Sequence, residues 1–198
     1  MNDFLTAVKN RRSYYNITNE AIISNEKLKE LIELAVEHSP SAFNSQSSRA
    51  VLLLGEEHKK LWDIALNKLK PLVSEENFVN TKQKIESFAA GYGTVLYYEE
   101  QTTVRALQDN FPLYSDNFPT WSEHASAILQ FVIWTALEAE GFGASLQHYN
   151  PLIDVEVAKT WDIPGDWKLI AQMPFGKPAG PAGDKSFLPI DTKVKVFG

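Results

Sequence analysis

The stretch Ile128-Leu129-Gln130-Phe131-Val132-Ile133-Trp134 restricts the folds that this chain of 198 residues can adopt. It lies in a segment, residues 122–140, for which Ser122 predicts a helix start and Gly141 a helix end. Because the middle of this helix is apolar on every face, it must be covered on all sides. A chain of this size builds one core, so complete cover points to a second subunit.

The rest of the chain alternates further helices with a few short strands. Apolar residues at helical spacing predict helices at residues 3–11, 24–38, 57–70, 75–88, 102–109 and 154–161. Apolar runs rich in β-branched and aromatic residues predict strands at 50–54, 94–98 and 167–173, a short extended piece at Leu146 and a terminal strand at 193–197. Helices outnumber strands, which predicts a single α+β domain over residues 1–198, with a small sheet that carries helices.

Composition excludes several functional classes. With 19 Lys and Arg against 25 Asp and Glu, the net charge is −6, and the chain lacks the basic footprint of a nucleic-acid binder. The absence of cysteine excludes disulfides, thiolate catalysis and iron–sulfur clusters. No apolar signal region follows Met1, and the longest apolar run, residues 125–137, is shorter than the ~20 residues that span a bilayer. We therefore expect a soluble cytoplasmic protein with neither nucleic-acid nor membrane partners.

The common catalytic and metal templates find no match. The four histidines lack metal-ligand spacing, and no G-x-S-x-G elbow occurs. Gly91-Tyr92-Gly93 precedes a predicted strand, so it is interpreted as a tight turn and not as a dinucleotide fingerprint. Glu99 and Glu100 could form a carboxylate pair, but neighbouring strand residues point to opposite faces, so the two are interpreted as a solvated strand end. The prediction is therefore no catalytic side chain and no metal site.

Four segments remain as candidate ligand contacts. Arg11-Arg12-Ser13 can hold a phosphate by charge-assisted bonds, although arginines at a helix end also suit the helix dipole. The loop at residues 39–46 is rich in hydroxyl and amide groups that could meet a planar polar ligand. Glycines in residues 141–151 permit close backbone approach, and the segment 175–186 offers two lysines. For each of the last three segments, a solvated loop is the alternative interpretation.

In this order, the four segments resemble the nitroreductase family of FMN flavoproteins. The resemblance rests on Arg-Arg-Ser at 11–13, Pro-Ser-x-x-Asn-x-Gln at 40–46 and Gly-Phe-Gly-Ala-x-x-Gln-His-Tyr-Asn at 141–150. The chain is most similar to a short subgroup that includes the fungal fatty-acid-regulating nitroreductase-like proteins and bacterial relatives. It departs from the common pattern at Ser47-Ser48, where many members have Pro-Trp, and at Tyr14-Tyr15.

The resemblance implies a three-layer α/β/α sandwich that forms an intertwined homodimer with FMN sites at the interface. Arg11, Arg12 and Ser13 would meet the phosphate and ribityl chain, with Lys185 adding charge. The partner subunit would contribute the loop residues, and the late segment would lie beside the isoalloxazine ring. These two sets are Ser41, Ala42, Phe43, Asn44 and Gln46, and Gln147, His148, Tyr149 and Asn150. Lys82 and Lys84 are both candidates for an assisting lysine.

The implied activity is that of an oxidoreductase in which FMN carries the chemistry. NADH or NADPH would supply two electrons, and a nitroaromatic, a quinone or a similar electron-poor ring would accept them by a ping-pong mechanism. The alternative is a flavin-binding regulatory or storage protein with little turnover. Five aromatic residues are candidates either for walling the acceptor pocket or for packing in the core: Phe43, Phe111, Tyr114, Trp121 and Tyr149.

Overall fold

A small antiparallel sheet organises residues 3–198, the part of the chain that the computed structural model describes. Its strand order is β1-β5-β3-β2, and β4 pairs with β5. The strands are β1 Ile17–Thr18, β2 Ser48–Leu54, β3 Gly93–Glu100, β4 Gly143–Ala144 and β5 Trp167–Pro178. The helices are α1 Asp3–Asn10, α2 Asn25–His38, α3 Gly55–Leu69, α4 Glu75–Ala89, α5 Gln101–Asn110, α6 Phe118–Ala139 and α7 Asp154–Thr160. The predicted α+β class is confirmed.

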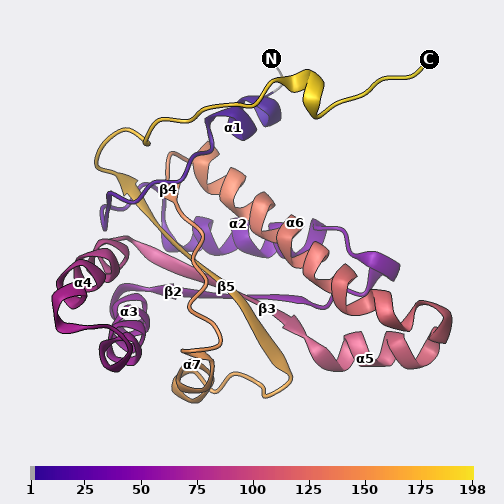
Figure 1. Cartoon of the computed structure of the whole chain (residues 1–198), viewed down its shortest axis with the longest axis horizontal. Coiled ribbons are helices and arrows are strands. Elements are labelled where there is room, and N and C mark those ends of the chain that lie inside the picture. Colours follow the sequence, from indigo (N-terminus) through magenta and orange to yellow (C-terminus); the bar gives the residue numbers. More distant parts are fainter. Residues whose placement is uncertain (1–2) are drawn as a thin grey trace.

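Helices cover both faces of the sheet, as Figure 1 shows, with α2 and α6 on one side and α3, α4 and α7 on the other. The alternation along β3 explains this arrangement, because successive strand side chains point to opposite faces. Val95 and Tyr97 belong to the core under α2 and α6. Leu96 and Tyr98 belong to the core on the side of α3, α4 and α7. The three-layer sandwich is therefore confirmed.

The long helix α6 begins earlier than the sequence predicted. It starts at Phe118, so Ser122 lies inside the helix, where its hydroxyl donates to the Pro119 carbonyl at 2.8 Å. The predicted cap at Ser122 is wrong because Pro119, in the first turn, already favours a helix start there. The predicted end is confirmed, since α6 finishes at Ala139 and Gly141 follows with φ +93°.

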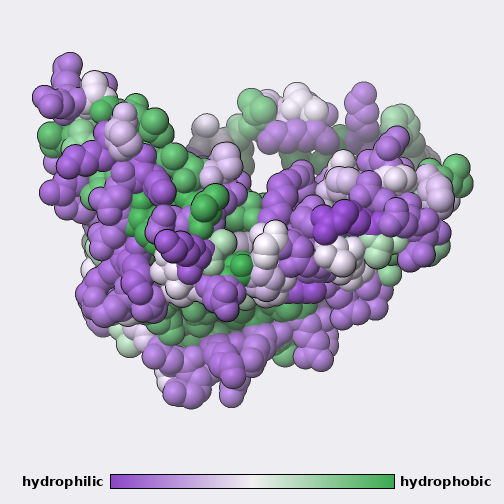
Figure 2. Space-filling view, turned by 90° about the horizontal axis from the view of Figure 1, so that it is seen from below, coloured by the Kyte–Doolittle hydropathy of each residue, from purple (hydrophilic) through white to green (hydrophobic). Residues whose placement is uncertain are grey.

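Part of the apolar surface of α6 stays uncovered within one chain. Nine residues of the helix are buried, yet Ile128 and Phe131 remain 40% and 38% exposed. Figure 2 shows that hydrophobic patches also break the hydrophilic surface of the face seen from below. Cover of α6 by a second subunit stays a prediction.

Within residues 3–198, no helix has both the length and the apolar character that crossing a bilayer requires.

The C-terminal part of the chain differs from its prediction in two ways. Strand β5 continues to Pro178, beyond the predicted end at Met173, because its last residues pair with both β1 and β4. The segment 193–197, predicted as a terminal strand too exposed to pair within its own subunit, forms no strand and has no strand partner within residues 3–198. The alternating pattern there reflects apolar side chains that stand exposed, Val194, Val196 and Phe197. The extended piece near Leu146 is confirmed by the bridge between Gln147 and Gln172.

Candidate functional site

The two N-terminal arginines follow directly on α1. The Arg11 backbone N–H donates to the Ala7 carbonyl at 2.8 Å, which closes the last turn of the helix. The chain then runs beside β4: Ser13 forms a bridge with Ala144, and the Tyr14 N–H donates to the Ala144 carbonyl at 3.0 Å. This pairing holds residues 11–13 at the edge of the sheet, next to the start of the segment that leads to residues 147–150.

A cavity of about 360 Å³ brings the cationic candidates together. Its lining consists of Arg11, Arg12, Ser13, Tyr15, Gly183, Asp184 and Lys185. The Arg12 guanidinium donates to the Gly183 carbonyl, which ties the C-terminal segment to the end of α1. Three cations thus face one carboxylate, and no ion pair within residues 3–198 neutralises any of the three. The cavity has the charge and donor groups of an anion site.

The side chain of Arg11 packs on the ring of Trp134 from α6. The guanidinium carbon of Arg11 lies 4.4 Å from the centre of the Trp134 ring, a cation–π contact. The Arg11 Nε and the Trp134 Nε1 are both buried without an acceptor in the described part of the chain. A buried donor without an acceptor costs about 1–3 kcal/mol, and an anionic oxygen at this position would remove that cost. These residues therefore fit the phosphate of FMN, the cofactor that the sequence resemblance implies.

The loop at residues 41–46 holds a strained backbone. Phe43, Asn44 and Gln46 have φ values of +57°, +51° and +48°. Such left-handed conformations are uncommon for residues other than glycine and cluster at ligand sites. The Gln46 N–H donates to the Ser41 hydroxyl at 2.9 Å, which closes the loop on itself. Phe43 and Asn44 are left exposed at its tip.

A second cavity, of about 420 Å³, lies between this loop and the first half of α6. Phe43 stacks on Trp121 with an interplanar angle of 18°, and its ring centre lies 4.8 Å from that of Phe111. Tyr114 joins the same aromatic cluster. Most of the residues that line this cavity are apolar, and His124 is the one ionisable side chain among them. Besides Phe43, the lining residues are Pro40, Ser41, Ala42, Trp121, His124, Ala125 and Ile128. Such a cavity suits a planar aromatic molecule.

The two cavities lie at different ends of α6. Trp134 supports Arg11, whereas His124 lines the aromatic cavity. Ten residues of helix separate them, roughly 15 Å at 1.5 Å per residue. Within one chain, residues 11–13 and 41–43 therefore line two different cavities.

The segment 147–150 is held by one buried side chain, Gln172 of β5. Its backbone exchanges two hydrogen bonds with Gln147, at 2.7 and 2.9 Å. Its side-chain oxygen accepts from the Tyr149 N–H at 2.7 Å, and its amide nitrogen donates to the Asn150 side chain at 3.4 Å. Because the backbone N–H groups of Gln147 and Tyr149 are occupied, those of His148 and Asn150 are the candidate donors here. The sequence analysis missed Gln172, whose role depends on a pairing that only the fold creates.

Tyr149 does not join the aromatic cavity. Its ring packs edge-on against Trp62 and Phe88 in the core beside α3 and α4. Burial accordingly raises the pKa of Tyr149. Tyr149 was a candidate either for the wall of the acceptor pocket or for the core, and the structure places it in the core.

Neither candidate lysine of α4 lines the cationic cavity in the described part of the chain. Lys82 and Lys84 are both exposed, and Lys82 pairs with Glu86 at 3.6 Å. Residues 3–198 also contain no cluster of three or more histidine or acidic side chains that could hold a metal ion. The positive charge at the candidate site therefore comes from Arg11, Arg12 and Lys185.

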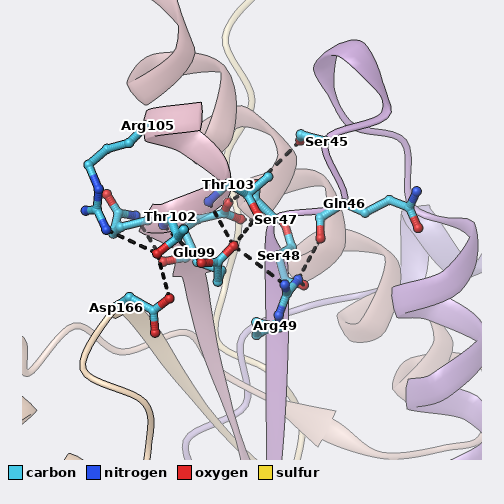
Figure 3. A network of polar contacts seen from close by, with 12 residues as sticks. Ser45, Gln46, Ser47, Ser48, Arg49, Glu99, Thr102, Thr103, Arg105 and Asp166 are labelled. Atoms are coloured by element: carbon cyan, nitrogen blue, oxygen red, sulfur yellow. Dashed lines mark hydrogen bonds and ion pairs between the residues drawn. The ribbon is translucent and has the colours of Figure 1, made fainter. Parts of the chain in front are cut away.

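The interpretation of Glu99 and Glu100 as a solvated strand end is wrong, because both are buried. Glu99 accepts hydrogen bonds from Ser47 and Ser48, which directly follow the strained loop (Figure 3). Burial raises the pKa of Glu99, an effect that these two hydrogen bonds oppose. Glu100 caps α5 and accepts from the Thr102 and Thr103 N–H groups at 3.0 and 2.9 Å. Burial alone would raise the pKa of Glu100, but its hydrogen bonds outweigh burial and lower it.

Comparisons with known proteins give one consistent family. The sequence profile described as "Nitroreductase family" matches residues 8–177. The Saccharomyces cerevisiae protein HBN1 is 32% identical over 193 residues, which cover 96% of each chain. The nitroreductase FRM2 of the same yeast is 31% identical over 197 residues, which cover 98% of this chain and 97% of FRM2.

Solved structures agree with that assignment. The nitroreductase CinD from Lactococcus lactis, in complex with nicotinic acid, superposes with a TM-score of 0.92 and 44% identity over 98% of this chain and 100% of CinD. CinD has also been solved with chloramphenicol and with 4-nitrophenol. A structure from Desulfovibrio desulfuricans that contains FMN shares the fold, with a TM-score of 0.72 at 17% identity. The sequence profile and the full-length relatives together show that this chain belongs to the nitroreductase family.

Proposed function

We propose that this protein is an FMN-dependent oxidoreductase that passes two electrons from NADH or NADPH to nitroaromatic, quinone or similar electron-poor acceptors. One observation carries the proposal: residues from both ends of the chain form one cationic cavity, and Arg11 in its lining has a buried Nε without an acceptor in the described part of the chain. When bound, FMN would supply the redox chemistry by accepting a hydride and returning two electrons to an acceptor.

The residues of the chain would bind and orient the cofactor. Arg11, Arg12 and Lys185 would pair with its phosphate, and Ser13 would bond the phosphate or the ribityl chain. The N–H groups of His148 and Asn150 would face the polar edge of the ring system. No side chain is assigned the role of catalytic acid or base, because solvent can supply the protons of a flavin-mediated reduction.

We further propose that two copies of the chain share each site. Residues 11–13 and 41–43 line different cavities of one chain, and the loop would serve the cofactor of the partner subunit. The exposed Ile128 and Phe131 lie on the same helix and would be covered in such a dimer. A symmetric dimer would then contain two equivalent sites.

The relatives support an aromatic acceptor. CinD, at 42% identity, has been solved with 4-nitrophenol and chloramphenicol, both of which contain a nitroaromatic ring. The cavity at Phe43 and Trp121 has an aromatic and mostly apolar lining, which suits such a ring. The acceptor would stack there with the water-exposed tip of the loop closing over it.

Anaerobic stopped-flow spectroscopy of the FMN-loaded protein tests this function. We expect NADH or NADPH to bleach the flavin absorbance, and a quinone or nitroarene added afterwards to restore it. A yellow protein that neither nucleotide bleaches would instead support a flavin-binding regulatory or storage protein. A protein that cannot take up added FMN would refute both functions.

A further inference from the structure

We propose that Glu99 is a positioning residue that holds the loop at residues 41–46 in its flavin-binding conformation. This inference rests on the function proposed above, in which that loop contacts the cofactor of the partner subunit. Glu99 itself contacts neither cavity, so it would act through Ser47 and Ser48.

Both hydrogen bonds of the Glu99 side chain go to the two residues that follow the loop. The Ser47 hydroxyl donates to its Oε2 at 2.6 Å, and the Ser48 hydroxyl donates to its Oε1, so each carboxylate oxygen fixes one serine. Figure 3 shows the carboxylate between the two serines where β3 ends beside the start of β2. The backbone is tied here as well, because the Glu100 N–H donates to the Ser47 carbonyl at 2.9 Å. The carboxylate thus fixes the residues that follow Gln46.

The loop needs a fixed end because three of its residues hold positive φ values. Its internal bond from the Gln46 N–H to Ser41 closes the loop but does not attach it to the sheet. Arg49 adds a second attachment, with its Nη1 donating to the Gln46 carbonyl at 2.6 Å. If Ser47 and Ser48 lost their acceptor, the strained residues could relax toward ordinary backbone conformations.

Burying the Glu99 carboxylate carries a desolvation cost that an apolar side chain in the same space would not have. Glu99 is fully buried, and within residues 3–198 no ion pair neutralises it. Apolar residues of similar volume often replace buried charges without loss of stability. Packing alone therefore does not account for Glu99, whereas the fixed position of two consecutive hydroxyls does.

The test compares four variants for flavin affinity and stability. Glu99→Ala removes the acceptor, whereas Glu99→Gln retains an oxygen that accepts from one hydroxyl and an amide that donates to the other. The triple variant S47A/S48A/E99L replaces the carboxylate and the two hydroxyls that donate to it by apolar groups. His58→Ala is the control, because it disrupts a buried polar cluster at the other end of β3. Each protein is titrated with FMN and with riboflavin by flavin fluorescence, and its unfolding is followed in urea.

We expect Glu99→Ala to weaken FMN binding at least tenfold, which corresponds to about 1.4 kcal/mol. Riboflavin binding should weaken by the same factor, because the phosphate contacts are assigned to Arg11, Arg12 and Lys185 and not to the loop. Glu99→Gln should stay within about threefold of the wild type. The triple variant should recover stability relative to Glu99→Ala while its flavin affinity stays low. His58→Ala should lose stability and keep its flavin affinity.

Three outcomes would overturn the positioning role. Unchanged FMN affinity in both Glu99→Ala and the triple variant would show that the loop needs no attachment. Recovery of affinity together with stability in the triple variant would show a purely structural role. Equal loss of FMN affinity in His58→Ala would show a general effect of destabilisation. Wild-type protein that binds neither flavin would refute the proposed function itself.

Discussion

Acidification should destabilise this protein through one buried side chain, His58 of α3. His58 is 1% exposed, and burial lowers its pKa from 6.5 to about 4. Its Nε2–H donates to the Ala89 carbonyl at 3.2 Å, so its Nδ1 accepts from the Thr94 hydroxyl at 2.8 Å. Trp62 in turn donates to Thr94 at 3.0 Å. This chain of hydrogen bonds requires a neutral imidazole, because a protonated Nδ1 could not accept.

The sign and size of the effect follow from the two pKa values. Between pH 6.5 and pH 4 the unfolded chain binds a proton at His58 that the folded chain does not, so stability falls as pH falls. The contribution is fully present above pH 6.5. The shift of about 2.5 pH units corresponds to about 3 kcal/mol once titration is complete, of which about 2 kcal/mol is lost between pH 8 and pH 5.

Urea unfolding at a series of pH values measures this loss. We expect the wild-type free energy of unfolding to fall by about 2 kcal/mol more than that of His58→Gln between pH 8 and pH 5. The glutamine variant should be less stable at pH 8 but flatter with pH, because its amide does not titrate in this range. Parallel curves for the two proteins would refute the assignment of the acid sensitivity to His58.

Three further predictions concern the candidate site. Arg11→Ala should weaken FMN binding roughly 10- to 150-fold and leave riboflavin binding unchanged, because a lost charged hydrogen bond costs about 1.5–3 kcal/mol; the control Arg105→Ala, at an exposed position on α5, should change neither titration. Trp134→Leu should weaken FMN binding about 2- to 30-fold and Trp134→Phe less, since the cation–π contact is worth about 0.5–2 kcal/mol; equal losses would contradict a role for the aromatic face. Gln172→Leu should lower the free energy of unfolding by about 1–3 kcal/mol in urea, because the Tyr149 N–H loses its acceptor, and a wild-type value would show that the segment 147–150 is held by other contacts.

Local patterns in the sequence predicted most of the secondary structure. The apolar run at Ile128–Trp134 and the cap at Ser24 depend on neighbours along the chain, and the structure confirms both. The cap predicted at Ser122 is wrong because Pro119, in the first turn, favours an earlier helix start. The alternation at residues 193–197 failed because a strand requires a partner, and alternation alone does not supply one.

The candidate site depended more on tertiary structure. The residue types themselves suggested Arg11 as a phosphate contact, and the family resemblance added Lys185; the structure places both around one cavity. The prediction of a solvated strand end at Glu99 rests only on its place in the strand, and only the register of β2 with β3 reveals its serine partners. Trp134 was seen as part of an apolar run, and no local signal distinguishes a tryptophan that supports an arginine from one that fills a core.

Subunit mixing tests most directly the claim that two chains build each flavin site. One variant, R11A/R12A, removes the phosphate contacts, and a second, Ala42→Arg, places a charged side chain in the loop. Each homodimer should have little NAD(P)H-dependent nitroarene reductase activity. After unfolding and refolding together in equal amounts, half of the dimers should be mixed, each with one intact site, and activity should return to about a quarter of the wild-type value. A mixture that stays as inactive as its two parents would show that each site belongs to a single chain.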